Sequence, residues 1–149
     1  MVDGIDCPFC PPRPDDSPFW IKIATLGTST LYLDRNQTYR GHCLLVFDAR
    51  HVIGMESLAP GEFTGFMADF HASARAIAAA CQPDLMNYAS LGNVVPHLHW
   101  HLVPRYENDP RWGGPVYTTT REEMLHTSRS EEEYREVISA IRRHLLNTA

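Results

Sequence analysis

One short segment constrains the fold of this chain more than any other. From His97 to Leu102, histidine and apolar residues alternate strictly. Successive side chains of a β-strand point to opposite faces, so the segment predicts a strand with three imidazoles on one face and Leu98, Trp100 and Leu102 on the other. The apolar face must pack on a core. The histidine face must therefore look into a pocket or a second layer.

The patterns before and after this segment supply the other elements of a sheet domain. Runs with a period of two predict strands, apolar residues spaced by three and four predict helices, and Ser130 to Glu133 forms a capping box. The predicted elements are a hairpin of Trp20–Leu26 and Ser29–Asp34, strands at Cys43–Phe47, Leu85–Leu91 and Pro96–Pro104, a helix from Pro60 to the break at Gln82-Pro83, and a helix over 130–146. This order predicts an α+β fold: an antiparallel sheet of about five strands with a long central helix and a C-terminal helix.

The length of 149 residues is that of one ordinary domain, and we expect a single domain over 1–149. Two stretches lack a regular pattern. Residues 1–19 hold five of the eleven prolines, which predicts an irregular arm. Residues 105–128 contain two prolines and a Gly-Gly pair, which predicts an extended loop.

The composition excludes several classes of protein. A hydrophobic content of 44% and a net charge of −5 argue against disorder. The acidic balance also argues against a nucleic-acid binder, which normally shows a basic face. No apolar run approaches the roughly 20 residues of a membrane helix. The first six residues carry neither the basic nor the apolar region of a secretory signal, so we expect a cytoplasmic protein.

Three clustered histidines are also typical of a metal site. Same-face neighbours on a strand lie about 6.6 Å apart, so the first and third imidazoles would be about 13 Å apart. With Zn–N bonds of about 2.1 Å, one ion cannot easily collect all three, although two could share one. We therefore expect one imidazole to be structural or metal-bound and another to act as nucleophile or base. Imidazole suits that role because it is substantially neutral at pH 7 and leaves readily once bonded to an electrophile.

The four cysteines fall into two kinds. In a cytoplasmic chain, Cys7-Pro8-Phe9-Cys10 indicates metal or redox chemistry rather than a disulfide framework. Cys43 opens an apolar run and Cys81 ends an apolar helix face. We expect both to be small buried hydrophobic residues.

The triad segment, His97 to Val103, resembles the His-φ-His-φ-His-φ-φ motif of the histidine triad (HIT) family of nucleotide hydrolases and transferases. The resemblance extends over most of the chain. The matching features are Gly41 to Val46 with the following His51, an upstream Asp34, the N-terminal Cys7-x-x-Cys10 of bacterial-type members, and Gly92-Asn93 in place of the usual Gly-Gln. Two departures concern phosphate binding: Asn93 is one methylene shorter than Gln, and Val94 lacks the hydroxyl of the usual Ser or Thr.

The resemblance implies a fold and a mechanism. The fold is a small α+β unit that commonly forms a homodimer with one nucleotide site per subunit. His99 would be the nucleophile that attacks the α-phosphorus and forms a nucleotidyl-histidine, which water then cleaves. His101 would contact the phosphate and assist proton transfer, and its retention favours hydrolysis. The implied substrate-binding residues are Asp34, Asn87, Asn93, His99 and His101. For Asp34, the alternative is an ordinary turn residue before Arg35-Asn36-Gln37.

The resemblance also implies a structural zinc site. Cys7, Cys10, His51 and His97 match the zinc ligands of some bacterial-type members, and two thiolates with two imidazoles make a closed tetrahedral set. Such a site would tie the proline-rich arm to the sheet. The alternative is a reduced cysteine pair, with His51 supporting the active site.

These observations lead to one expected function with defined rivals. We expect hydrolysis of nucleotides at the α-phosphate, with dinucleoside polyphosphates or nucleoside phosphoramidates as substrates. The alternatives are a nucleotidyl transferase or phosphorylase, a non-catalytic nucleotide-binding regulator, and a metal-binding module built on the histidine strand.

Overall fold

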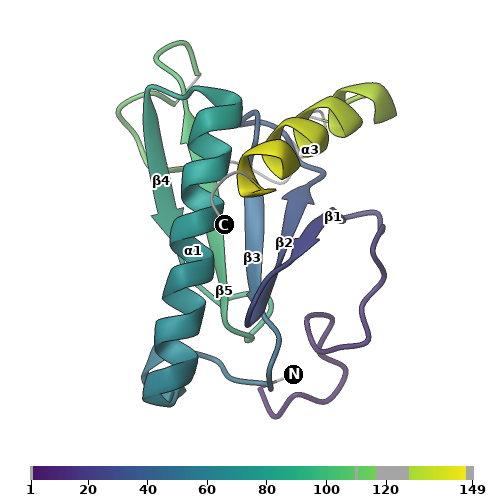
Figure 1. The fold of residues 1–149 in the computed structure, drawn as a ribbon, viewed down its shortest axis with the longest axis vertical. Helices are drawn as coiled ribbons and strands as arrows, with labels where there is room; N and C mark the ends of the chain where they lie inside the picture. The colour runs from purple at the N-terminus through teal and green to yellow at the C-terminus, as the bar shows by residue number, and fades with distance from the viewer. Residues whose placement is uncertain (1, 110, 117–127, 147–149) are drawn as a thin grey trace.

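The computed structural model describes residues 2–109, 111–116 and 128–146. In these ranges the chain forms five strands, two α-helices and one short 3₁₀ turn (Figure 1). In order they are β1 (Trp20–Thr25), β2 (Ser29–Asp34), β3 (Cys43–Phe47), η1 (Met55–Ser57), α1 (Pro60–Cys81), β4 (Leu85–Ala89), β5 (His99–Arg105) and α3 (Glu131–Leu146). The strands make one antiparallel sheet in the order β1-β2-β3-β5-β4. The predicted α+β fold is therefore confirmed.

Alternation along the strands gives the sheet two different faces. Helices α1 and α3 lie on the same side of the sheet, and the main core lies beneath them (Figure 1). This core contains Leu31, Leu33, Leu45, Phe66, Ile77, Leu98, Leu102, Ile138 and Ile141. Leu98 and Leu102 are fully buried there and Trp100 packs against the same cluster, as the alternation predicted. The opposite face, which we call the histidine face, carries His99 and His101 beside Val46 and Leu44 of β3.

The N-terminal arm covers part of the histidine face. Phe9 packs with Trp20 and Tyr32 in a second apolar cluster on this side. Arg13 anchors the arm, because its Nε donates to the Tyr32 hydroxyl at 3.0 Å and its guanidinium forms an ion pair with Asp48. Arg13 and Asp48 are largely shielded from water, so Arg13 fixes the arm to β2 through Tyr32 and to the end of β3 through Asp48.

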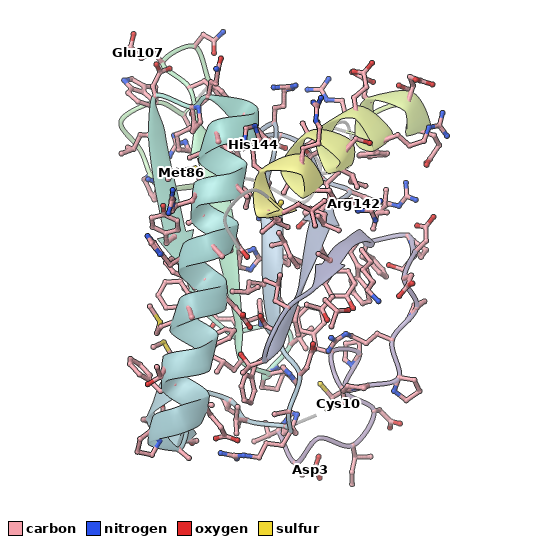
Figure 2. The ribbon with its side chains drawn as sticks, in the orientation of Figure 1. Asp3, Cys10, Met86, Glu107, Arg142 and His144 are labelled. Atoms are coloured by element: carbon pink, nitrogen blue, oxygen red, sulfur yellow. The ribbon has the colours of Figure 1, made fainter. Side chains whose placement is uncertain are left out.

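The two helices are fastened to the strands by polar contacts as well as by the core. Asp69 of α1 accepts hydrogen bonds from the backbone of Gly27 and Thr28 and thereby caps the turn of the β1–β2 hairpin. Arg142 of α3, labelled in Figure 2, donates to the carbonyl oxygen of Ile23 on β1 at 2.7 Å. The predicted capping box also forms at the start of α3, where Ser130 is one of its two members.

The predicted strand over Pro96–Pro104 is partly wrong. β5 begins only at His99, because β3 ends at Phe47 and the Val46–His99 pair is the last step of their ladder. Before it, the backbone N–H of Leu98 donates to the carbonyl oxygen of Val52 at 2.7 Å, outside the sheet. His97 is therefore not on the strand, and the three imidazoles do not share one strand face.

Smaller differences concern element ends. β1 stops one residue before the predicted Leu26 and β4 two residues before Leu91. Phe63, expected on the buried stripe of α1, is 43% exposed.

The predicted loop over 105–128 is only partly described. Arg105 is the last residue of β5, the described residues from there to 116 are irregular, and 117–127 lie outside the described residues. No helix in the described ranges is long and apolar enough to span a bilayer.

Candidate active site and metal cluster

His99 and His101 lie side by side on the histidine face, with ring centroids 5.1 Å apart. The Nδ1–H of His99 donates to the backbone carbonyl oxygen of His97 at 2.6 Å. A carbonyl oxygen only accepts, so this contact places the proton on Nδ1 and leaves the lone pair on Nε2. Burial lowers the pKa of His99, although the hydrogen bond to His97 opposes the shift. The imidazole is thus neutral near pH 7 and has a free electron pair on a defined nitrogen.

His101 begins a chain of polar groups that leads away from His99. Its Nδ1 lies 3.1 Å from Nε2 of His42, and Nδ1 of His42 lies 3.7 Å from a carboxylate oxygen of Asp34. Burial lowers the pKa of His101 to about 3, with further contributions from the charges of His42 and His99. Burial also raises the pKa of Asp34, against the attraction of His42. Only the contact between His101 and His42 is short enough for a hydrogen bond, so a proton can pass between these two imidazoles, whereas Asp34 faces His42 as an electrostatic neighbour.

Asp34 also does what a turn residue does. Its other carboxylate oxygen accepts from the backbone N–H of Asn36 at 2.8 Å, just after β2 ends. Gln37 closes the same turn. Its side-chain amide donates to the carbonyl oxygens of Asp34 and His42, and its Oε1 accepts from the backbone N–H of Gly41. Asp34 thus acts as a turn residue, and its second carboxylate oxygen faces His42.

Four further side chains meet where the arm joins the sheet. Sγ of Cys7 and Sγ of Cys10 lie 3.5 and 3.6 Å from Nδ1 of His97, and Sγ of Cys10 lies 3.4 Å from Nδ1 of His51. All four ligand atoms lie within 4.8 Å of one another. Figure 2 labels Cys10 on the arm, below the sheet in that view. The structure thus brings together the four residues predicted as metal ligands.

The protonation of the two imidazoles suits a metal. Nε2 of His97 donates to the carbonyl oxygen of Phe47 at 2.7 Å, and Nε2 of His51 donates to that of Val2 at 3.2 Å. Both Nδ1 atoms therefore direct lone pairs at the thiols. Bonds of about 2.3 Å to sulfur and 2.1 Å to nitrogen in a tetrahedral zinc site separate these atoms by about 3.6 Å. The observed separations agree, so the donor set fits Zn²⁺.

Comparison with known proteins gives the family. The HIT domain model matches residues 21–108, which is more than half of the chain. The chain belongs to the histidine triad (HIT) family. It is 27% identical over 145 residues to the adenylylsulfatase HINT3 of Arabidopsis thaliana, an alignment that covers 94% of this chain and 70% of the plant protein.

Solved HIT proteins share the fold. A histidine triad protein from Bradyrhizobium japonicum superimposes with a TM-score of 0.77 at 27% identity, over 85% of this chain and 90% of that one. A zinc-bound histidine triad family protein from Mycobacterium smegmatis gives a TM-score of 0.61 at 24% identity, over 89% and 88% of the two chains.

Asn87 of this HIT protein lies on the histidine face of β4, because it pairs with Val103 two residues beyond His101. Its Oδ1 accepts from Nη1 of Arg105 at 2.8 Å. A guanidinium only donates, so the amide must present its oxygen to Arg105 and its NH₂ group elsewhere. By contrast, Asn93 lies exposed in the β4–β5 connection, and no hydrogen bond between described residues joins it to the triad.

The guanidinium group of Arg105 is fully hydrogen-bonded. Its five N–H donors bond both carboxylate oxygens of Asp109, Oδ1 of Asn87 and the carbonyl oxygens of Arg111 and Gly114, at 2.7 to 3.1 Å. Arg105 is only 2% exposed. It therefore holds the segment after β5 against the end of the sheet and also fixes the amide of Asn87.

Sequence reasoning missed two residues of this HIT site. His42 stands just before the buried β3 run, and its position next to the triad follows from the Leu44–His101 register of β3 and β5. Phe9 lies between the two cysteines, where only its aromatic character could have drawn attention. Its ring contacts His99. The buried positions expected for Cys43 and Cys81 are confirmed.

Proposed function

We propose that this HIT protein hydrolyses nucleotides at the α-phosphate through a nucleotidyl-histidine on His99. The observation that carries the proposal is the 2.6 Å hydrogen bond from Nδ1 of His99 to the carbonyl oxygen of His97, since it leaves the free electron pair on Nε2, the nitrogen that would attack. The similarity to a plant adenylylsulfatase supports chemistry at this phosphate.

The reaction proceeds in two displacements. Nε2 of His99 attacks the α-phosphorus, an N–P bond forms, and the bond from phosphorus to the leaving group breaks. The leaving group departs with the bonding electrons and takes a proton delivered through His101 and His42. Water then attacks the phosphorus and gives a proton back to the same pair, the N–P bond breaks, and the nucleoside monophosphate leaves. Asp34 would bind the ribose hydroxyls, and the amide donors of Asn87 would bind substrate oxygens.

Three kinds of leaving group are consistent with this mechanism. They are a second nucleotide in a dinucleoside polyphosphate, an amine in a nucleoside phosphoramidate, and sulfate in adenylyl sulfate, which the name of the plant relative suggests. A phosphorylase would use phosphate in place of water in the second displacement, and a regulator would bind the nucleotide without turnover.

The test is a turnover panel with one compound of each kind, comparing the wild type with His99→Ala. Hydrolysis by the wild type with a loss of at least about 10³-fold in the variant is expected, because the variant lacks the nucleophile. Equal rates in both proteins would overturn the covalent mechanism. Phosphate-dependent product would favour the phosphorylase, and AMP binding without turnover would favour the regulator.

We further propose that Cys7, Cys10, His51 and His97 bind one structural Zn²⁺. Bound there, zinc would supply a crosslink between the arm and the sheet rather than chemistry on the substrate, because four protein ligands leave no open position. Reduced thiols are needed for that role, which supports a cytoplasmic location.

We also propose a homodimer that uses the edge of the sheet at β4. Edge strands present unpaired backbone groups to a partner. Leu85 and Tyr88 of β4 are 51% and 43% exposed, and Leu91 just beyond is 49% exposed. Light scattering should give twice the chain mass of 16.9 kDa. Leu85→Asp should give the monomer, whereas Phe19→Asp, at an exposed position on the arm, should not.

A further inference from the structure

Phe9 connects the metal cluster to the proposed nucleophile. It is the third residue of Cys7-Pro8-Phe9-Cys10, yet its side chain is only 6% exposed. Its ring lies edge-on to the imidazole of His99, with centroids 4.9 Å apart and an interplanar angle of 69°. A second edge contact joins it to His97 at 6.1 Å. Phe9 is thus an arm residue that touches two members of the triad.

The backbone around Phe9 has little freedom. The N–H of Cys10 donates to the carbonyl oxygen of Cys7 at 3.1 Å and closes the segment into a turn. A guanidinium nitrogen of Arg13 donates to the carbonyl oxygen of Phe9 itself. On its far side the ring packs against Trp20, with centroids 5.5 Å apart. With both cysteines held by the histidines of the cluster, Phe9 can hardly move without breaking the cluster.

His99 needs such a contact. The hydrogen bond to His97 fixes one ring atom, but the second torsion of histidine is broad and one bond leaves the ring free to swing about it. Phe9 and His101 are ring neighbours of His99, at 4.9 and 5.1 Å. Nucleophilic attack requires the reacting nitrogen to stay aligned with phosphorus, and a misplacement of about 1 Å can cost about 10²-fold in rate.

We propose that Phe9 is a positioning residue for His99, held in place by the Cys7, Cys10, His51 and His97 cluster. The metal site on the arm then restrains the orientation of the His99 ring on β5 through Phe9. His97 contributes to both ends of it, because its Nδ1 faces the thiols and its carbonyl oxygen holds Nδ1 of His99. The inference rests on the proposed function and on the proposed zinc site.

The diagnostic variant is Phe9→Leu, which keeps the apolar volume but removes the aromatic edge from His99. Pro8→Ala is the matched control, since Pro8 is an exposed neighbour in the same turn. Three quantities are measured on the zinc-loaded protein: bound zinc per chain, kcat and KM, and the ¹⁵N signals of the His99 ring. Phe9→Leu should keep its zinc, lose about tenfold or more in kcat with KM within about twofold, and show altered His99 ring signals. Pro8→Ala should match the wild type in all three.

A second measurement removes the zinc instead of the ring. Chelation of the wild type should shift the His99 signals, and chelation of Phe9→Leu should add much less, because both changes act through the same contact. A Phe9→Leu protein with wild-type kcat and wild-type His99 signals would overturn the proposal. So would a chelated wild type whose His99 signals stay in place. If no substrate of the panel is turned over, the proposed function fails, while the zinc and ring measurements still decide the role of Phe9.

Discussion

The Nδ1–H of His99 is bonded to the carbonyl oxygen of His97 across 2.6 Å, and the side chain of His97 turns to the opposite end of the site, toward Cys7 and Cys10. One residue thereby orients the proposed nucleophile with its backbone and contributes its ring to the proposed metal site. This arrangement is possible because β5 starts after His97 rather than before it.

The metal cluster should hold one zinc per chain as isolated. Mass spectrometry of Cys10→Ser or His51→Gln should show loss of the metal, because each removes one of four ligands. His71→Gln, on the exposed side of α1, is the control and should retain it. Chelation of the wild type should lower the free energy of unfolding by about 3 kcal/mol. For a chain of this size each kcal/mol shifts Tm by about 3 °C, so Tm should fall by roughly 10 °C. An unchanged Tm after complete removal would contradict a structural role.

His101 should make the protein less stable as the pH falls. Its pKa of about 3 in the folded state lies below the value of about 6.5 in an unfolded chain. Between those values the unfolded chain binds the proton and the folded chain does not, so stability falls as the pH drops below 6.5. The groups that face His101 are His42, His99 and, through His42, Asp34.

The measurement is denaturant unfolding between pH 7 and pH 4. The wild type should lose up to about 1.4 kcal/mol per pH unit through this group, and His101→Gln should show a flatter curve. His71→Gln serves again as the control and should follow the wild type. Parallel curves for His101→Gln and the wild type would mean that His101 is not a buried neutral imidazole.

Asp109 and Arg105 should be needed for the fixed orientation of Asn87. The side chains of this ion pair are 3% and 5% exposed for Arg105 and Asp109, and Arg105 holds the pKa of Asp109 below its usual range. Asp109→Asn should destabilise the protein by roughly 3 kcal/mol, because Arg105 stays buried with fewer acceptors.

Asn87→Asp should fold well, since a carboxylate accepts from Arg105, but should raise KM because the amide donors are gone.

A double-mutant cycle decides whether the two residues act together. If Arg105 works through Asn87, Arg105→Lys should raise KM in the wild-type background and have little further effect in Asn87→Ala. Additive effects on KM would mean that Arg105 serves the fold alone.

His42 should contribute to proton transfer although it lies outside the triad. His42→Ala removes the partner 3.1 Å from His101 and should lower kcat by about 10²-fold with a smaller change in KM. Steady-state kinetics on the preferred substrate measure this, with Tm as the check on folding. If kcat stays within twofold of the wild type, His101 must exchange its proton directly with solvent.

The local elements of the fold were open to prediction from short-range patterns. The capping box of Ser130 and Glu133, the stripe of α1 and the period-two hairpin each depend on residues a few positions apart. All three appear in the structure, the stripe without Phe63. Element ends were less accurate, as with β4, which stops at Ala89 because its pairing with β5 ends there. A ladder ends where its partner ends, which depends on residues far along the chain.

The amino-acid sequence alone was sufficient for the fold class, for the family resemblance and for the four possible metal ligands that the structure brings together, because spacing and residue type express these locally. The role of His99 stays a prediction. Three relationships needed the tertiary structure. They are the turn of His97 out of the strand, the contact of His42 with His101 over 59 positions, and the edge of Phe9 against His99. The first two depend on which strand ends beside which, and strand registry is set by packing of the entire core rather than by the residues that it brings together. The third depends on how the arm packs on the histidine face.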